Sequence, residues 1–143
     1  QPLPVQALPA TALALKVAAT LAVGGFDGDR FPFYFEDVDL CLRLRERGYR
    51  LLLVPEARAI HRGAATAGTG TRFSLYHATR GQVALALGSG GGGLRGAGLA
   101  ALFSAASLSR PGEDPLASRA LGVLLGIRDG LANQCTEHEM HGS

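Results

Sequence analysis

The sequence predicts a mixed α/β protein, with a small α/β portion over about residues 1–62 and helices over about residues 71–130. Two observations support this prediction. In the first portion, short apolar runs of strand length alternate with segments whose apolar residues recur at helical spacing. In the second portion the apolar segments are long, have helical spacing, and are not followed by a strand pattern. A chain of 143 residues is enough for one modest core.

The expected elements of the first portion are short. Three prolines make the first ten residues an extended lead-in, and Gly24 and Gly25 end the first helix. After a loop, a second helix begins at Glu36 and is ended by Gly48, and a buried strand comes next. In order, we expect a lead-in at 1–10, a strand at 11–15, a helix at 16–23, a loop at 27–32, a helix at 36–48, and strands at 49–54 and 57–61.

The second portion opens with a Gly/Ala/Thr loop over residues 62–71 and continues with a helix over residues 73–87. Six residues at 88–93, five of them glycine, read as a flexible linker. Two further helices over 94–109 and 115–129 and a disordered tail from Asn133 complete the prediction.

The first of these two helices contains an uncharged stretch of 14 residues, Gly96 to Ser109, between Arg95 and Arg110. A helix that spans a bilayer needs about 20 apolar residues, so this stretch is too short to cross one. It either lies on a membrane surface or packs on the rest of the domain.

Charge and cysteine content exclude several classes of protein. A net charge of +2 with scattered basic residues argues against a nucleic-acid-binding protein. Cys41 and Cys135 lie far apart and have neither the pattern of a disulfide framework nor a metal-ligand spacing. A reducing compartment is the simpler interpretation.

The stretch from Gly24 to Arg43 has the features of a functional site. It holds five of the nine Phe and Tyr residues and five of the twelve acidic residues of the chain. Glu36 and Asp37 fall in the first turn of the expected helix, where acidic residues also serve as plain helix caps. The aromatic run before them can instead form an apolar wall beside a catalytic carboxylate. Asp37 and Asp39 point about 200° apart on a helix and therefore do not form a metal-binding pair.

Five segments, in this order, resemble the family 2 glycosyltransferases of the GT-A type, especially the rhamnosyltransferase-like branch. The match runs from about Thr11 to Leu87, and residues 119–131 resemble the family's closing helix. The segments are Gly-Gly-Phe-Asp at 24–27, Phe-Tyr-Phe-Glu-Asp-Val-Asp-Leu-Cys-Leu-Arg at 33–43, Gly-Tyr-Arg-Leu at 48–51, Val-Pro-Glu-Ala at 54–57 and Ile-His-Arg-Gly at 60–63.

The resemblance implies a partial GT-A fold, the acceptor-side half of the enzyme, as the C-terminal part of a longer protein. Residues 1–87 would form that portion, 88–93 the linker, 94–132 a helical C-terminal extension and 133–143 the tail. The nucleotide-binding half is missing from this sequence, so we expect the chain to be inactive by itself.

The implied reaction is an inverting transfer from a nucleotide-diphosphate sugar, such as dTDP-rhamnose, to a hydroxyl of a cell-surface glycan or lipid-linked acceptor. Asp37 matches the catalytic base and Glu36 shapes the site beside it. His61 matches a position that helps to hold a divalent cation, Mg or Mn, together with the missing half. The implied location is the cytoplasmic face of the bacterial cell membrane, with peripheral contact. The implied substrate-binding residues are Gly24, Gly25, Phe26, Asp27, Tyr34, Phe35 and Arg62.

Two competing patterns point elsewhere. Gly88 to Gly93 satisfies the Gly-x-Gly-x-x-Gly pattern of a dinucleotide loop, but no second strand follows it. His138 and His141 lack the four-residue spacing of a zinc protease motif. As an alternative function, the chain is a non-catalytic helical module that binds a membrane or a protein partner.

Overall fold

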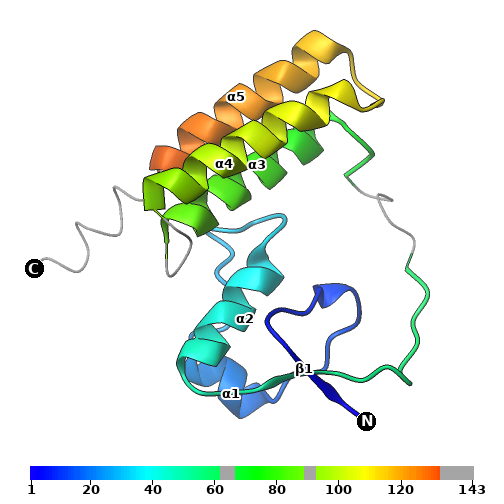
Figure 1. Cartoon of the computed structure of the whole chain (residues 1–143), viewed down its shortest axis with the longest axis vertical. Helices are drawn as coiled ribbons and strands as arrows, with labels where there is room; N and C mark the ends of the chain where they lie inside the picture. Colours follow the sequence, from blue (N-terminus) through cyan, green and yellow to red (C-terminus); the bar gives the residue numbers. More distant parts are fainter. Residues whose placement is uncertain (62–66, 89–92, 133–143) are drawn as a thin grey trace, which may run out of the picture. The chain divides into compact units, whose positions relative to one another are not determined.

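The computed structural model describes residues 1–61, 67–88 and 93–132, and the chain divides into two compact units, Gln1–Gly63 and Ala64–Ser143. Within these ranges the protein is mixed α/β and mostly helical, with one two-stranded sheet, as the coarse fold prediction expected (Figure 1). Each unit is described by itself below.

The first unit is built around helix α2 (Glu36–Glu46). Its core joins Leu40, Cys41 and Leu44 of this helix to Leu51 of the following strand. Four partly buried residues pack around this core. Val5 and Leu8 come from the N-terminal segment, Ala19 from α1 (Val17–Ala22), and Val23 follows the end of α1. Three of the apolar residues that recur at helical spacing in α2, Leu40, Cys41 and Leu44, are therefore buried.

The sheet of this unit pairs β1 (Leu3–Val5) with β2 (Leu51–Leu53) in an antiparallel register. Leu3 lies opposite Leu53, and Val5 lies opposite Leu51. The lead-in expected over residues 1–10 thus contains a strand. The strand expected over 49–54 is shorter, and only its Leu51 is buried, because the sheet has two strands and leaves the side chains beyond Leu51 exposed.

Two strands predicted from the sequence are absent from the described residues. The first two residues of the expected strand over 11–15 belong to a 3₁₀ helix, η1 (Ala10–Ala12), and residues 13–15 have no regular structure. Residues 57–61 are also irregular. Neither segment has a neighbouring strand to pair with in the described sheet, and a strand without a partner leaves its backbone groups unbonded.

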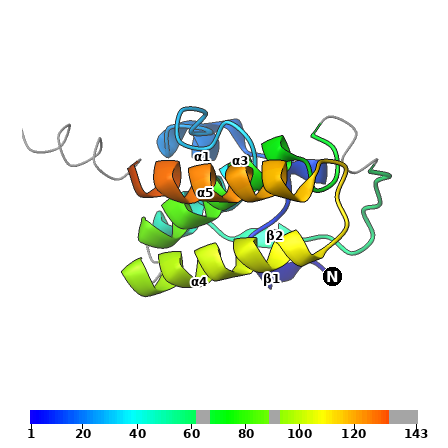
Figure 2. The same cartoon turned by 90° about the horizontal axis from the view of Figure 1, so that it is seen from above.

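The second unit consists of three helices, α3 (Arg72–Leu87), α4 (Gly93–Ala106) and α5 (Leu116–Ala132), with a short 3₁₀ helix, η2 (Ser107–Ser109), after α4. Both α4 and α5 pack against α3 (Figure 2). These helices confirm the three helical segments predicted from the sequence.

Side chains fix the start of α3 on two sides. The Thr71 hydroxyl accepts a hydrogen bond from the Ser74 N–H at 3.0 Å. The Asp114 carboxylate accepts one from the Arg72 N–H at 2.6 Å. The two contacts satisfy N–H groups that a helix leaves unbonded at its first turn, and the second ties α3 to the segment that leads into α5.

Three glycines of α5 allow its backbone to lie directly on α3. A Cβ built on Gly122, Gly126 or Gly130 would lie 2.6–2.8 Å from a carbonyl oxygen of α3. These oxygens belong to Arg72, Tyr76 and Arg80, spaced one helical turn apart like the glycines themselves. The two helices therefore approach more closely than any side chain at these positions would permit.

The resemblance grouped residues 1–87 together, whereas the two units of the structure separate α3 from residues 1–63. In the structure α3 belongs with α4 and α5, because its buried residues Val83 and Ala84 lie in their common core. Of the predicted linker, Gly88 follows α3 and Gly93 begins α4. Residues 89–92, the loop residues 62–66 and the tail from residue 133 lie outside the described residues.

None of the helices described in either unit reaches the length and apolar character that a bilayer crossing requires.

Candidate functional site

The aromatic run predicted to line a site lies directly before α2 and has an unusual backbone. Tyr34 and Phe35 have φ angles of 62° and 70°, in the left-handed region that bulky residues rarely adopt. Each costs about 1–2 kcal/mol relative to ordinary backbone. The two residues turn the chain into the helix, and Phe35 occupies the N-cap position without a side-chain hydrogen bond. Strained residues of this kind cluster at functional sites.

Asp37 is held in place by two backbone N–H groups. Its Oδ2 accepts from Ala10 at 2.8 Å, and its Oδ1 accepts from Val38 at 2.8 Å. The first bond connects α2 to the segment around η1, across 27 residues of sequence. Asp37 is partly exposed, so the carboxylate is oriented by the protein and still open to solvent.

Glu36 precedes Asp37 and is half-buried. Its Oε2 atom is enclosed and accepts no hydrogen bond from the described residues. A carboxylate oxygen without a partner is costly, and a ligand hydroxyl that reaches it would remove that cost. The carboxylates of the first turn thus provide one oriented and one unsatisfied acceptor.

Asp39 has a structural role. It is 4% exposed, and its Oδ2 accepts from the Nε and Nη2 atoms of Arg43 at 2.8 and 2.6 Å. Arg43 also donates to the Val23 carbonyl at the end of α1. Asp37 and Asp39 therefore have separate partners, in agreement with the sequence argument against a metal-binding pair.

The predicted acceptor-binding residues before this turn have clear local roles. Gly24 and Gly25, at φ angles of 82° and 75°, end α1, and their N–H groups donate to carbonyls of its last turn. The Asp27 carboxylate accepts from the Arg30 N–H at 2.8 Å and closes the next turn. Phe26 is 45% exposed and is available for contact with a ligand.

The predicted cation site is represented by one residue. His61 is exposed, and Arg62 lies outside the described residues. Over residues 1–61, 67–88 and 93–132, no group of three or more His, Cys, Asp or Glu side chains is placed to hold a metal ion. Mg²⁺ and Mn²⁺ prefer several oxygen ligands, and a single imidazole does not supply them. The cation remains a prediction, and no chemical step is assigned to it.

A hollow of about 430 Å³ lies beside the segment that Asp37 holds. None of the residues predicted for the site lines this hollow. Ala10, which donates to Asp37, lies between the lining residues Pro9 and Thr11. The sequence predicted strands at 11–15 and 57–61, where this hollow is lined by a 3₁₀ helix and irregular segments, and so did not predict it. Its walls are residues 8–9 and 11–14, Leu52 to Val54, and Ala57 to Ala59.

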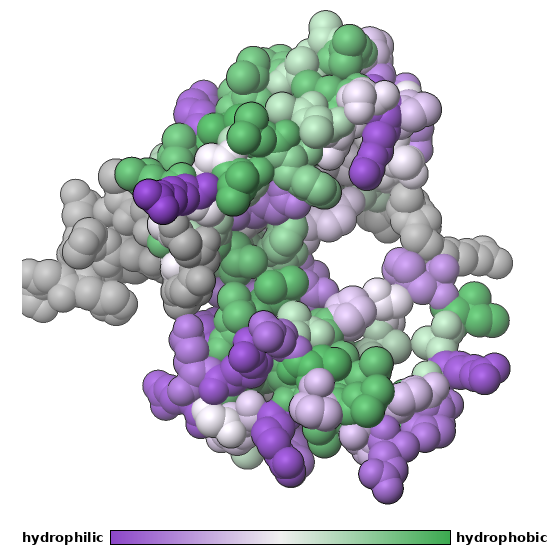
Figure 3. All heavy atoms as spheres, viewed as in Figure 1, coloured by the Kyte–Doolittle hydropathy of each residue, from purple (hydrophilic) through white to green (hydrophobic). Residues whose placement is uncertain are grey.

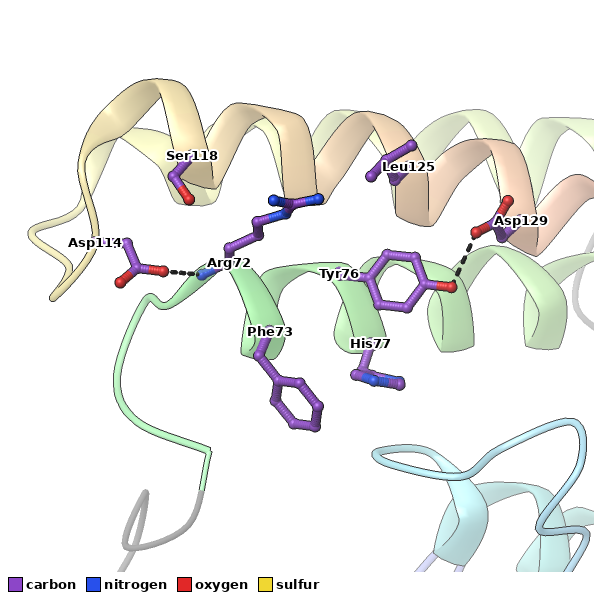
Figure 4. A pocket seen from close by; sticks show the side chains of 8 residues that line it. All are labelled: Arg72, Phe73, Tyr76, His77, Asp114, Ser118, Leu125 and Asp129. Carbon is purple, nitrogen blue, oxygen red and sulfur yellow. Dashed lines mark hydrogen bonds between the residues drawn. The ribbon is translucent and has the colours of Figure 1, made fainter.

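The second unit contains a pocket of about 600 Å³ that the sequence did not predict (Figure 4). Its walls come from the first half of α3, from α5 and from Asp114. The Arg72 side chain extends along α5, and the Tyr76 hydroxyl donates to Asp129 Oδ2 at 2.9 Å. Phe73, Tyr76 and His77 form an aromatic cluster, with ring centroids of neighbouring pairs 4.4 and 4.8 Å apart.

Three titratable side chains of this pocket have shifted pKa values. The hydrogen bond from Arg128 Nε to Asp129, with further help from Tyr76, lowers the pKa of Asp129, and burial raises the pKa of Tyr76. Burial and the nearby Arg80 lower the pKa of His77, which favours a neutral imidazole. The pocket therefore combines aromatic rings with a neutral imidazole and suits a small molecule with a flat apolar face. The close α3–α5 contact creates this pocket, and local sequence does not reveal such contacts.

The chain matches no protein-family model, and no curated protein and no solved structure is significantly similar to it.

Proposed function

We propose that the first unit is the acceptor side of an inverting, family 2-like glycosyltransferase. The observation that supports this most directly is Asp37, a partly exposed carboxylate in the first turn of α2, oriented by two N–H groups. The strained aromatic pair before it gives further support. The proposed location is the cytoplasmic face of the cell membrane.

In this proposal Asp37 takes the proton from an acceptor hydroxyl while the hydroxyl oxygen attacks the anomeric carbon of the donor sugar. The bond from that carbon to the diphosphate breaks on the opposite face, and the nucleoside diphosphate leaves. One carboxylate is enough for such a single displacement. Glu36 accepts a hydrogen bond from a neighbouring hydroxyl of the acceptor. The rings of Phe26, Tyr34 and Phe35 form the apolar side of the path along which the acceptor enters.

The test is a transfer assay with radiolabelled nucleotide-diphosphate sugars and a hydroxyl-bearing glycan acceptor. We expect the full-length gene product to transfer sugar with inversion at the anomeric carbon, and this chain by itself to give no turnover. Retention of configuration, or no transfer from any donor by the full-length gene product, would contradict the proposal.

A second candidate function is a non-catalytic module that binds a membrane or a protein. The exposed apolar residues of α4 favour it: Leu94, Leu99, Leu102 and Phe103. The two functions are distinguished by the same assay, because a binding module gives no transfer with or without Asp37.

A further inference from the structure

Helix α4 turns its large apolar residues toward solvent and small or polar residues toward the neighbouring helices. A helix that packs on a core usually does the reverse. Its buried residues are Ala97 and Ser104, and the Ser104 hydroxyl donates to Gln82 Oε1 of α3 at 2.9 Å. Its large apolar side chains face outward: Leu94, Leu99, Leu102 and Phe103 are 81%, 68%, 69% and 60% exposed. We call these four residues the α4 apolar face. A helix that packs on a core in water normally buries such residues.

Helix α5 repeats the same arrangement. It buries Arg119, three glycines and a single larger apolar residue, Val123, while Leu121, Leu124 and Leu131 are exposed. Hydrophobic residues accordingly gather over the helical unit in the space-filling view (Figure 3). Small residues at helix contacts with leucines outward are typical of helices that meet lipid. Large exposed apolar patches mark interaction surfaces.

The charges at the ends of the α4 apolar face indicate the kind of partner. Arg95 and Arg110 are exposed at either end of an uncharged stretch, and α4 has no acidic residue. The nearest acidic residues along the chain, Glu113 and Asp114, accept from the Thr69 and Arg72 N–H groups. An apolar helix face with one arginine in its first turn and a second just after the following 3₁₀ helix complements the acyl chains and anionic headgroups of a lipid surface.

A second copy of the chain fits this face less well. A symmetric contact through α4 would bring the arginines of both copies, Arg95 and Arg110, onto one interface, where their positive charges repel. Helix α4 has no carboxylate to pair with them. A lipid surface supplies the negative charge that such a dimer would lack.

We propose that α4 docks on the surface of an anionic membrane, with its apolar face at the boundary between headgroups and acyl chains. The helix lies along the membrane surface and does not cross the bilayer, since the described part of the chain has no helix able to cross one. This inference is independent of the transfer reaction, because it involves residues of the second unit alone.

The first test is flotation of the full chain with vesicles of phosphatidylcholine, alone or mixed with phosphatidylglycerol. We expect binding to the anionic vesicles that falls as salt is added. The double variant Leu102→Ser/Phe103→Ser should bind at least about tenfold more weakly, since it removes two side chains from the bilayer. Replacing Arg95 and Arg110 with Gln should weaken binding roughly fivefold for each arginine.

The matched control is Leu21→Ser on α1, where Leu21 is 71% exposed, close to the 69% of Leu102. It should bind vesicles as the wild type does. Equal loss in this control and in the double variant would overturn the proposal, as would failure of the wild type to bind anionic vesicles. A dimer that the double variant dissociates, found together with no vesicle binding, would assign the face to a second copy and also overturn it.

A second measurement covers the case in which the double variant does not fold. The chain has no tryptophan, so the single variant Leu99→Trp provides a unique fluorescent reporter on the α4 apolar face. Its emission should shift to shorter wavelength when anionic vesicles are added, while that of Leu21→Trp stays constant. An unchanged emission from the residue 99 reporter contradicts docking.

Discussion

Two adjacent aromatic residues in left-handed backbone set the direction in which α2 begins. Tyr34 and Phe35 occupy a conformation that glycine adopts without cost, so the turn stores strain directly before Asp37. In the proposed function this strain serves to present the rings and the carboxylate to the same acceptor. Its size is measurable without any knowledge of the substrate.

We predict that Tyr34→Gly is more stable than Tyr34→Ala by about 1 kcal/mol, the reverse of the ordinary order. Both variants remove the ring, so the difference reports the backbone alone. Urea unfolding of the two variants gives the free energies. The same pair at Phe33, whose φ is not positive, should show alanine as the more stable residue. Equal stabilities at position 34 would contradict the strain.

The stability of the second unit should depend on pH through His77. Burial and Arg80 lower its pKa in the folded state, so the unfolded chain binds more protons just below the ordinary pKa of 6.5. The free energy of unfolding should therefore decrease as pH falls below about 6.5, until the folded-state pKa is passed. His77→Gln should remove this part of the pH dependence. Unfolding curves across this range that are parallel for the two proteins would argue against it.

At the scale of elements, the contact between α3 and α5 depends on the absence of side chains. Gly126 is the tightest of the three positions: a Cβ there would lie 2.6 Å from the Tyr76 carbonyl oxygen and 2.8 Å from Thr79 Cβ. Backbone atoms cannot move aside as a flexible side chain can. The helices would have to separate along their length.

We predict that Gly126→Ala lowers the free energy of unfolding by about 1–3 kcal/mol through overpacking. Gly98→Ala in α4 is the matched control, since nothing lies within 4 Å of a Cβ there. It should be neutral or stabilise by up to about 1 kcal/mol, because alanine favours helix more than glycine does. Thermal melts of both variants check this. A Gly126→Ala protein as stable as the wild type would contradict the close packing.

The helices were predictable from the sequence, but of the three strands expected only the one over 49–54 forms in the described residues, as β2. The segments over 36–46 and 72–87 carry their helical spacing and their boundaries in local sequence. The pairing of β1 with β2 joins residues about 50 apart, and the strand expected at 11–15 finds no partner strand in the described sheet. A strand depends on its neighbour, and local sequence does not identify that neighbour.

The candidate site also has a part that the sequence could predict and a part that it could not. Composition pointed to the stretch from Gly24 to Arg43, because aromatic and acidic side chains concentrate there, and the resemblance singled out Asp37 within it. The bond from Ala10 to Asp37 and the pocket between α3 and α5 depend on contacts across 27 and about 50 residues. Such long-range contacts were beyond what the sequence pattern could predict.

At the scale of the whole molecule, the two units have separate proposed tasks. The first presents Asp37 to an acceptor, and the second places its helices on a lipid surface. Variants in one unit should therefore leave the other task unchanged. The double variant in α4 should retain transfer to a water-soluble acceptor, measured with the full-length gene product, while losing vesicle binding. Loss of both activities together would show that the tasks are not separate.

If Asp37 takes the proton of the acceptor hydroxyl, asparagine at this position should slow transfer, and the transfer rate of Asp37→Asn in the full-length gene product measures this effect. Asparagine keeps an oxygen that can accept from the Ala10 N–H but cannot take a proton. We expect a rate roughly a hundredfold to ten-thousandfold below that of the wild type. Glu46→Gln, an exposed acidic residue at the other end of α2, should keep the wild-type rate. An Asp37→Asn enzyme that transfers as fast as the wild type would contradict this role of Asp37.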